Sequence, residues 1–190
     1  MLVALSVAQA YGSDDLSDRT VLVQGVGSVG AALAELLARD GAAVLVADVD
    51  AERAETVAAA VGGSSVASDQ AIATECDVYA PCALGATLSA ESVPQLRCRI
   101  VAGSANNQLA QPDAAELLRA AGILYAPDYV INAGGAIAIN YLELNDRSQS
   151  DVDAALVKIG DTLREIYERA DGEGITTAAA ADALAASRLS

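Results

Sequence analysis

The chain has 190 residues, of which 53% are hydrophobic, and its 26 acidic and 11 basic residues give a formal net charge of −15. A surface this acidic repels nucleic acids and anionic membranes, so neither is expected as a partner. No apolar run is long and uncharged enough to span a bilayer, and the amino terminus lacks the basic region of a signal peptide. We expect one cytoplasmic domain over residues 1–190. Its acidity fits a salt-rich cytoplasm or a GC-rich genome equally well.

The cysteines Cys76, Cys82 and Cys98 are odd in number and contain no CxxC pair. Because the chain also has no histidine, neither a zinc site nor any other metal site is expected. We predict that all three are reduced thiols, as is usual in a reducing compartment.

The first expected element is a helix at Leu2–Tyr11, apolar on most faces and packed on a sheet. Thr20–Gln24 is a short β-rich run that predicts a buried strand. After a glycine-rich turn, Ala31–Arg39 shows the leucine spacing of a helix. A second apolar strand is expected at Ala43–Ala47, and it ends on an acid.

The glycine-rich turn reads Gly25-Val26-Gly27-Ser28-Val29-Gly30, which has GxGxxG spacing. Gly25 allows a sharp turn, Gly27 lets a pyrophosphate approach the backbone, and Gly30 lets the helix pack closely on the strands. The helix N-terminus would offer N–H groups to the phosphates. The order strand, glycine turn, helix, strand and acid predicts a dinucleotide site. The plainer interpretation is a βαβ unit that only folds.

The acid that ends the second strand is Asp48, near the spacing expected for a residue that binds the adenosine ribose. Its carboxylate can accept both ribose hydroxyls. A 2′-phosphate would instead meet the negative charges of Asp48 and Asp50, so the sequence favours NAD over NADP. Arg53 is the nearby base, and we expect it one turn into the next helix.

The rest of the chain continues the alternation of helices and strands. Further helices are expected from Asp50 to Val61, from Ser68 or Asp69 onward, and at 136–145, 152–169 and 178–187; further strands at 64–67, within 77–86 and at 99–103; and apolar segments at 123–125 and 129–131, with Tyr79, Tyr125 and Tyr129 in the core or on strands. This pattern predicts the α/β class: a doubly wound, mainly parallel Rossmann-type sheet with helices on both faces and a helical carboxyl-terminal tail.

Four blocks, in the order GVGSVG, CDVYAPCALGATLS, VAGSANNQL and YAPDYVINAGGAI, resemble the cofactor domain of leucine, valine and phenylalanine dehydrogenases. These enzymes belong to the glutamate dehydrogenase superfamily. The last three blocks are far more specific than the glycine turn. The resemblance implies NAD-dependent, reversible oxidative deamination of a branched-chain or aromatic L-amino acid to a 2-oxo acid and ammonia, in a homo-oligomer.

The resemblance also implies roles for particular residues. Gly25, Val26, Gly27, Ser28, Val29, Gly30 and Ala31 would hold the pyrophosphate; Asp48 the adenosine ribose; Ala80, Pro81, Cys82, Ala83 and Leu84 would lie along the nicotinamide side; Asn106 would lie by the nicotinamide ribose or ring; and Asn132 would reach the substrate. An amide suits a substrate that carries both a carboxylate and an amine, because it can donate and accept.

One departure from the family pattern is large. The family's full chain begins with a substrate domain that carries the catalytic lysine, and here the match starts near Leu2. Lys158, the one lysine, lies in a segment with helical periodicity and is expected to be a solvated surface residue rather than a catalyst. Cys82 has no histidine to activate it and is expected to be a packing thiol. We therefore predict no catalytic residue in this chain.

Three functions are compatible with this sequence. The chain could be the NAD-binding half of an amino-acid dehydrogenase, inactive alone: a truncated copy, half of a split gene with a separately encoded substrate domain, or a reading frame that starts at an internal methionine. It could be a stand-alone NAD-binding module without catalytic activity. A small dehydrogenase with all its substrate groups in these 190 residues is least favoured, because the acid–base inventory is poor.

Overall fold

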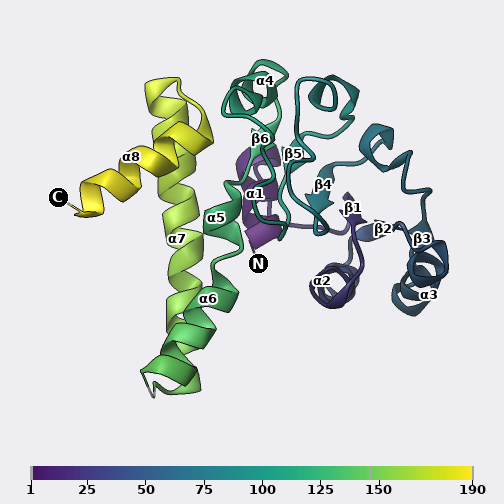
Figure 1. Ribbon diagram of the computed structural model, residues 1–190, viewed down its shortest axis with the longest axis horizontal. Helices are drawn as coiled ribbons and strands as arrows, with labels where there is room; N and C mark the ends of the chain where they lie inside the picture. The colour runs from purple at the N-terminus through teal and green to yellow at the C-terminus, as the bar shows by residue number, and fades with distance from the viewer. Residues whose placement is uncertain (1, 146, 190) are drawn as a thin grey trace.

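The computed structural model describes residues 2–145 and 147–189. Within this part, six strands form one sheet whose printed pairings are all parallel, in the order β3-β2-β1-β4-β5-β6 (Figure 1). The strands are β1 Thr20–Gln24, β2 Ala43–Ala47, β3 Ser64–Ser65, β4 Val78–Pro81, β5 Ile100–Val101 and β6 Leu124–Tyr125. The chain runs outward from β1 to β3 and then returns to the other side of β1. This is the Rossmann order, with its reversal between β1 and β4.

The helices follow the expected alternation with the strands. They are α1 Leu2–Tyr11, α2 Ser28–Arg39, α3 Ala51–Val61, α4 Ala114–Ala120, α5 Asp128–Ile131, α6 Gly134–Ala138, α7 Gln149–Glu173 and α8 Thr177–Leu189, with short 3-10 turns η1 Ala71–Ala73 and η2 Val93–Gln95 and a π-helical segment η3 Ile139–Leu144. The predicted strands Thr20–Gln24 and Ala43–Ala47 and the predicted helix Leu2–Tyr11 are confirmed at both ends. None of the described helices is long and apolar enough to cross a membrane.

Side chains that alternate along the strands build a separate core on each face of the sheet. Val21 and Val23 belong to a cluster formed with α1, α2, α3, α7 and α8, whereas Leu22 and Tyr79 belong to a second cluster formed with η1, η2 and α4. Figure 1 shows α2 and α3 on one side of the sheet and α4 on the other. Val21, Leu22 and Val23 are each 0% exposed. Full burial of such side chains contributes about 1.5–3 kcal/mol each. Because helices and turns cover both faces of the sheet, the predicted doubly wound packing is confirmed.

Two expectations about elements need correction, and one helix was not expected. Helix α2 begins at Ser28 rather than at Ala31, because Gly27 occupies the N-cap position and its carbonyl oxygen already accepts from Ala31 N at 2.9 Å. Helix α4 was not predicted, since its seven residues are too short for a clear period. Tyr129 lies on the short helix α5, where it is 50% exposed, rather than in the core or on a strand. Pro127 explains this difference, because it cannot extend a central strand and its fixed φ starts a helical turn.

Both edges of the sheet are two-residue strands. At one edge, β3 consists of Ser64 and Ser65, which are both exposed. At the other edge, the hydroxyl of Thr177, at the start of α8, donates to the carbonyl of Tyr125 on β6 at 2.7 Å. Tyr125 itself is 3% exposed and lies in the core, as predicted.

Candidate functional site

The carboxyl ends of β1 and β4 lie side by side where the strand order reverses. The turn after β1, Gly25–Gly30, is here called the glycine loop. It touches the segment after β4, because a Cβ built on Gly25 would lie 2.5 Å from the Cβ of Ala83. The backbone of Cys82 also donates to Gln24 O at 2.7 Å. In an open α/β sheet, ligands bind at this reversal point.

The conformation of the glycine loop requires glycine at two positions. Gly25 has a φ of +91°, in the region that favours glycine. A Cβ on Gly30 would lie 1.9 Å from the carbonyl oxygen of Gly25 and 3.3 Å from the Cβ of Cys82. The first turn of α2 therefore packs directly on the loop that precedes it. The sequence predicted both of these tasks.

The start of α2 is open to a ligand. A Cβ on Gly27 would meet no heavy atom within 4 Å, and within the described residues no side chain caps this helix. The first N–H groups of a helix have no partner inside the helix, and they carry the positive end of its dipole. An uncapped helix start with free space beside Gly27 fits the phosphate groups of a dinucleotide.

Asp48 follows β2 at the carboxyl ends of the strands, beside the glycine loop, but its carboxylate is mostly engaged with the protein. It is 8% exposed; Oδ2 accepts from Val26 N at 2.8 Å, and Oδ1 accepts from Asp50 N at 3.0 Å. Arg53 Nη1 also lies 3.3 Å from Oδ1. Burial by itself raises the pKa of this carboxyl, but the N–H donors of Asp50 and Val26 and the Arg53 charge outweigh it, so the pKa is lowered. Asp48 thus fixes the glycine loop, a role that its position in the sequence does not reveal.

This contact makes the stability of the fold depend on the ionised form of Asp48. Because the folded-state pKa is lowered, the stabilisation is complete above the unfolded value near pH 4 and is lost as the pH falls through the folded value. We expect the thermal midpoint of the wild type to exceed that of Asp48→Asn at pH 7, and the two midpoints to converge below about pH 4. Thermal unfolding of both proteins across this range measures the gap. A gap that does not change with pH would contradict this linkage.

The segment that follows β4 presents mainly backbone and small side chains. Ala80 and Pro81 are buried at the end of the strand, while Leu84 is 84% exposed. Burial raises the pKa of the Cys82 thiol, which suits packing rather than nucleophilic chemistry. All three cysteines are free, as predicted.

Asn106 and Asn132, placed far apart in the sequence, meet at this edge. Asn132 Nδ2 donates to Asn106 Oδ1 at 2.6 Å. Asn106 also lies against the segment after β4, since a Cβ on Gly85 would be 2.3 Å from its carbonyl oxygen. The residues that the resemblance assigns to the cofactor and to the substrate therefore form a row of contacts from Asp48 to Asn132.

Two further residues hold this row in place, and they were not among the predicted site residues. The fully buried Gln108 donates through Nε2 to Gly103 O at 2.9 Å and to Ala105 O at 3.0 Å. Its backbone N–H donates to the carboxylate of Asp128 at 2.7 Å, and the other oxygen of Asp128 accepts from Tyr129 N, also at 2.7 Å. Asp128 is only 6% exposed and joins the loop after β5 to α5. The sole sequence signal was their presence in the SANNQ and APDYVINAGG blocks.

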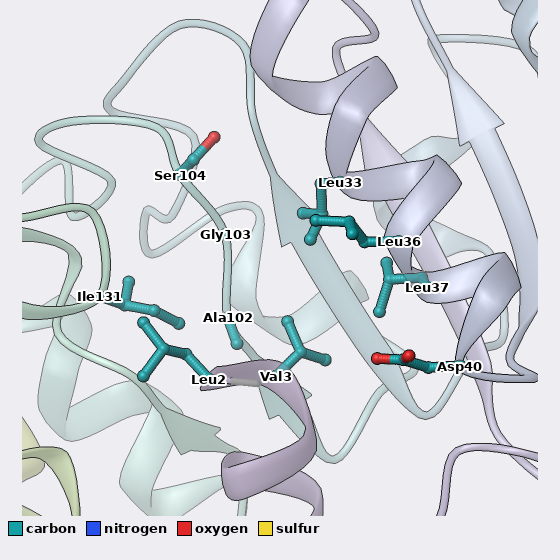
Figure 2. Close-up of a pocket in the computed structure, with 10 residues that line it drawn as sticks. All are labelled: Leu2, Val3, Leu33, Leu36, Leu37, Asp40, Ala102, Gly103, Ser104 and Ile131. Atoms are coloured by element: carbon teal, nitrogen blue, oxygen red, sulfur yellow. The ribbon is translucent and has the colours of Figure 1, made fainter. Parts of the chain in front are cut away.

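Other groups lie away from this row. Lys158 is exposed on α7 and lines a different hollow, between α5, α6, η3 and α7. In the described residues, no group of three or more cysteine or acidic side chains is arranged to hold a metal ion. An apolar hollow of about 190 Å³ lies beside α2. Figure 2 shows its lining, which is mainly aliphatic side chains from α1, α2 and α5. This hollow lies along the side of α2 rather than at its open end, so it is not the phosphate position.

The strand order and the glycine loop together define a Rossmann-type α/β domain. The model of the glutamate/leucine/phenylalanine/valine dehydrogenase family matches residues 45–190. The chain belongs to this family.

Individual relatives agree with this assignment. A leucine dehydrogenase from Bacillus cereus is 40% identical over 95% of this chain and 49% of its own length. A valine dehydrogenase from Streptomyces albus is 45% identical over 94% of this chain and 50% of its own. The crystal structure of L-tryptophan dehydrogenase from Nostoc punctiforme matches 98% of this chain and 56% of its own, with a TM-score of 0.93 and 38% identity. The chain thus spans about half the length of these curated relatives.

Proposed function

We propose that this chain is the NAD-binding half of an amino-acid dehydrogenase that deaminates a branched-chain or aromatic L-amino acid. The observation that carries this proposal is the uncapped start of α2 beside the open space at Gly27, at the reversal point of the sheet. The named activities of the similar dehydrogenases support the reaction class. When bound, NAD would supply the hydride acceptor.

The residues fit this cofactor provided that the Arg53 side chain moves away from Asp48. Backbone N–H groups from Gly27 onward would hold the pyrophosphate, and Ala80–Leu84 would lie along the nicotinamide side. Asp48 would accept the ribose hydroxyls through its remaining lone pairs, and Arg53, which is 49% exposed, would have to shift away from it. Asn106 would lie by the nicotinamide ribose or ring.

Asn132 would orient the amino acid beside that ring. Its amide now donates to Asn106, so a substrate carboxylate could take over this donor while the amide oxygen accepts from the substrate amine. The acid–base groups would come from a substrate domain, and the working enzyme would be a homo-oligomer in the cytoplasm. The alternative is an NAD-binding module without catalysis.

The isolated chain should bind NADH at least about tenfold more tightly than NADPH, because like charges placed together cost several kcal/mol. The extra phosphate of NADPH would face Asp48 and Asp50. Titration with each nucleotide, followed by nucleotide fluorescence, gives the two dissociation constants. Equal or tighter binding of NADPH would overturn the Asp48 assignment.

Matched variants locate the source of this preference. Asp48→Ala should weaken NADH more than NADPH, since it removes the hydroxyl acceptor and the repelling charge together. Arg53→Ala should increase the preference for NADH, because Arg53 pairs with Asp48 at 3.3 Å and with Asp50 at 3.0 Å and offsets their charge. Asp40→Asn, at the opposite end of α2, should leave the ratio unchanged.

A further inference from the structure

A polar hollow of about 610 Å³ lies at the amino ends of the strands, where β1, β4 and β5 begin, on the opposite side of the sheet from the glycine loop. Its lining includes Tyr11 from the end of α1, Glu75 and Asp77 from the segment before β4, and Arg97 and Arg99 from the segment before β5. The proposed dinucleotide position uses none of these residues. The site argued below is therefore independent of NAD binding.

Two arginines that line this hollow lack carboxylate partners among the described residues and lie close together in the sequence. Several arginines elsewhere pair with carboxylates, as Arg53, Arg119 and Arg164 do at 2.7–3.3 Å. Within the described residues, by contrast, Arg97 and Arg99 are exposed, and their guanidinium groups have neither a hydrogen bond nor an ion pair, although their backbones are hydrogen-bonded. What distinguishes this pair from other unpaired arginines is that both line one hollow, in a chain with 26 acidic and 11 basic residues.

A third arginine, Arg19, contacts two residues that line the hollow, Tyr11 and Asp77. The guanidinium carbon of Arg19 lies 4.0 Å from the ring centroid of Tyr11, and that of Arg99 lies 4.7 Å from the same centroid. Arg19 Nη1 is 3.7 Å from Asp77 Oδ1, and its buried Nε has no hydrogen-bond partner among the described residues. Contact with an aromatic ring engages the guanidinium without using its N–H donors.

Asp77 forms no ion pair with Arg97 or Arg99 among the described residues, and its oxygens accept from other donors. Oδ1 accepts from the hydroxyl of Tyr11 at 2.7 Å, and Oδ2 accepts from Thr20 N at 2.8 Å. Glu75 is exposed and forms no ion pair among the described residues, although it is bridged to Arg97 through the backbone. With Arg19 included, these groups leave three positive charges against two negative ones.

We infer that this hollow binds the phosphate group of a small organic phosphate. Guanidinium groups match phosphate oxygens with paired, charge-assisted N–H donors. Arg97 and Arg99 are separated by one residue and line the same hollow, so two such groups can face one phosphate. The hollow is larger than one inorganic ion requires, which leaves room for an organic portion beside Tyr11.

The test follows the side-chain N–H signals of the arginines by NMR in the isotope-labelled full chain, with inorganic pyrophosphate as the probe. NADH is present to occupy the glycine loop, and residue-specific signals distinguish the two sites even if NADH does not bind. Pyrophosphate should shift the signals of Arg97 and Arg99 saturably. Arg97→Gln with Arg99→Gln should weaken this binding by at least about tenfold, as expected for loss of charge-assisted contacts.

Two further variants test whether pyrophosphate affinity depends on the charge of the hollow. Glu75→Gln removes a repelling charge and should tighten pyrophosphate binding. Arg39→Gln, which changes another exposed arginine without an ion pair in the described part of the chain, should leave binding unchanged. Shifts confined to the signals of Arg53, which lies beside the glycine loop, equal weakening by Arg39→Gln, or equally tight binding of malonate would each overturn the phosphate site. Signal dispersion of every variant shows whether it is folded.

Discussion

Gly30→Ala should destabilise the fold severely, whereas Gly27→Ala should leave it stable and damage only nucleotide binding. A Cβ at position 30 would lie 1.9 Å from the Gly25 carbonyl oxygen, and backbone cannot move aside as a flexible side chain can. Overpacking typically costs about 1–3 kcal/mol, and a clash with backbone belongs at the upper end of this range. A cost of about 3 kcal/mol corresponds to a fall of about 6–12 °C in the thermal midpoint for a domain of this size. Thermal unfolding of both variants measures the difference.

Gly27→Ala is the matched control within the same loop. Its Cβ would meet nothing within 4 Å, and its φ of −67° suits alanine. The midpoint should therefore stay within about 2 °C of the wild type, while NADH affinity falls at least about tenfold because the methyl group occupies the pyrophosphate position. A stable Gly30→Ala protein, or normal NADH binding by Gly27→Ala, would contradict this account of the loop.

The purified 190-residue chain should bind NADH yet form none from leucine, valine or phenylalanine. Hydride transfer needs the amino acid held against the nicotinamide, and such orientation is worth about 7–11 kcal/mol of barrier. Acid–base assistance adds roughly 10²–10⁴-fold in rate. Asn132 offers one amide, Lys158 is exposed on α7, and the Asp128 carboxylate is buried with both oxygens engaged. No described residue of the row supplies a free base.

The assay follows nicotinamide absorbance with each amino acid at saturating concentration, on protein whose NADH binding has first been verified. Addition of a separately expressed lysine-bearing substrate domain, if the neighbouring DNA encodes one, should restore turnover. Failure of that complementation would favour the stand-alone binding module. Robust turnover by the chain alone would refute the half-enzyme proposal, and Lys158→Ala would then test the remaining lysine.

The parts of the fold that the sequence predicted well depend on local signals. Strands β1 and β2 are short apolar runs bounded by turn residues, and α3 is bounded by the Asp50 cap and by Gly62 in the left-handed conformation. The helix α4 and the turn into α5 depend on tertiary packing instead. Leu118 of α4 is fully buried against the second face of the sheet, and the seven-residue sequence of α4 gives no local signal that predicts this contact.

The candidate site shows the same division. GxGxxG spacing predicted where glycine would be required, because each requirement comes from backbone contacts within the loop. The engagement of Asp48 with Val26, and of Gln108 with Asp128, joins segments more than nineteen positions apart. Such pairings follow from how β1, β2, β5 and β6 are placed in the sheet, so a reading along the chain could not assign them.

The two short edge strands also affect how copies of this chain can associate. An exposed strand edge is a template for a strand from another molecule and so a route to aggregation. Here β3 offers only Ser64 and Ser65, and the Tyr125 carbonyl at the β6 edge is occupied by the Thr177 hydroxyl. Within the described residues, neither edge presents the long row of unpaired backbone groups that intermolecular β-pairing needs. We therefore expect any self-association of this domain to use its helices and loops rather than extension of the sheet.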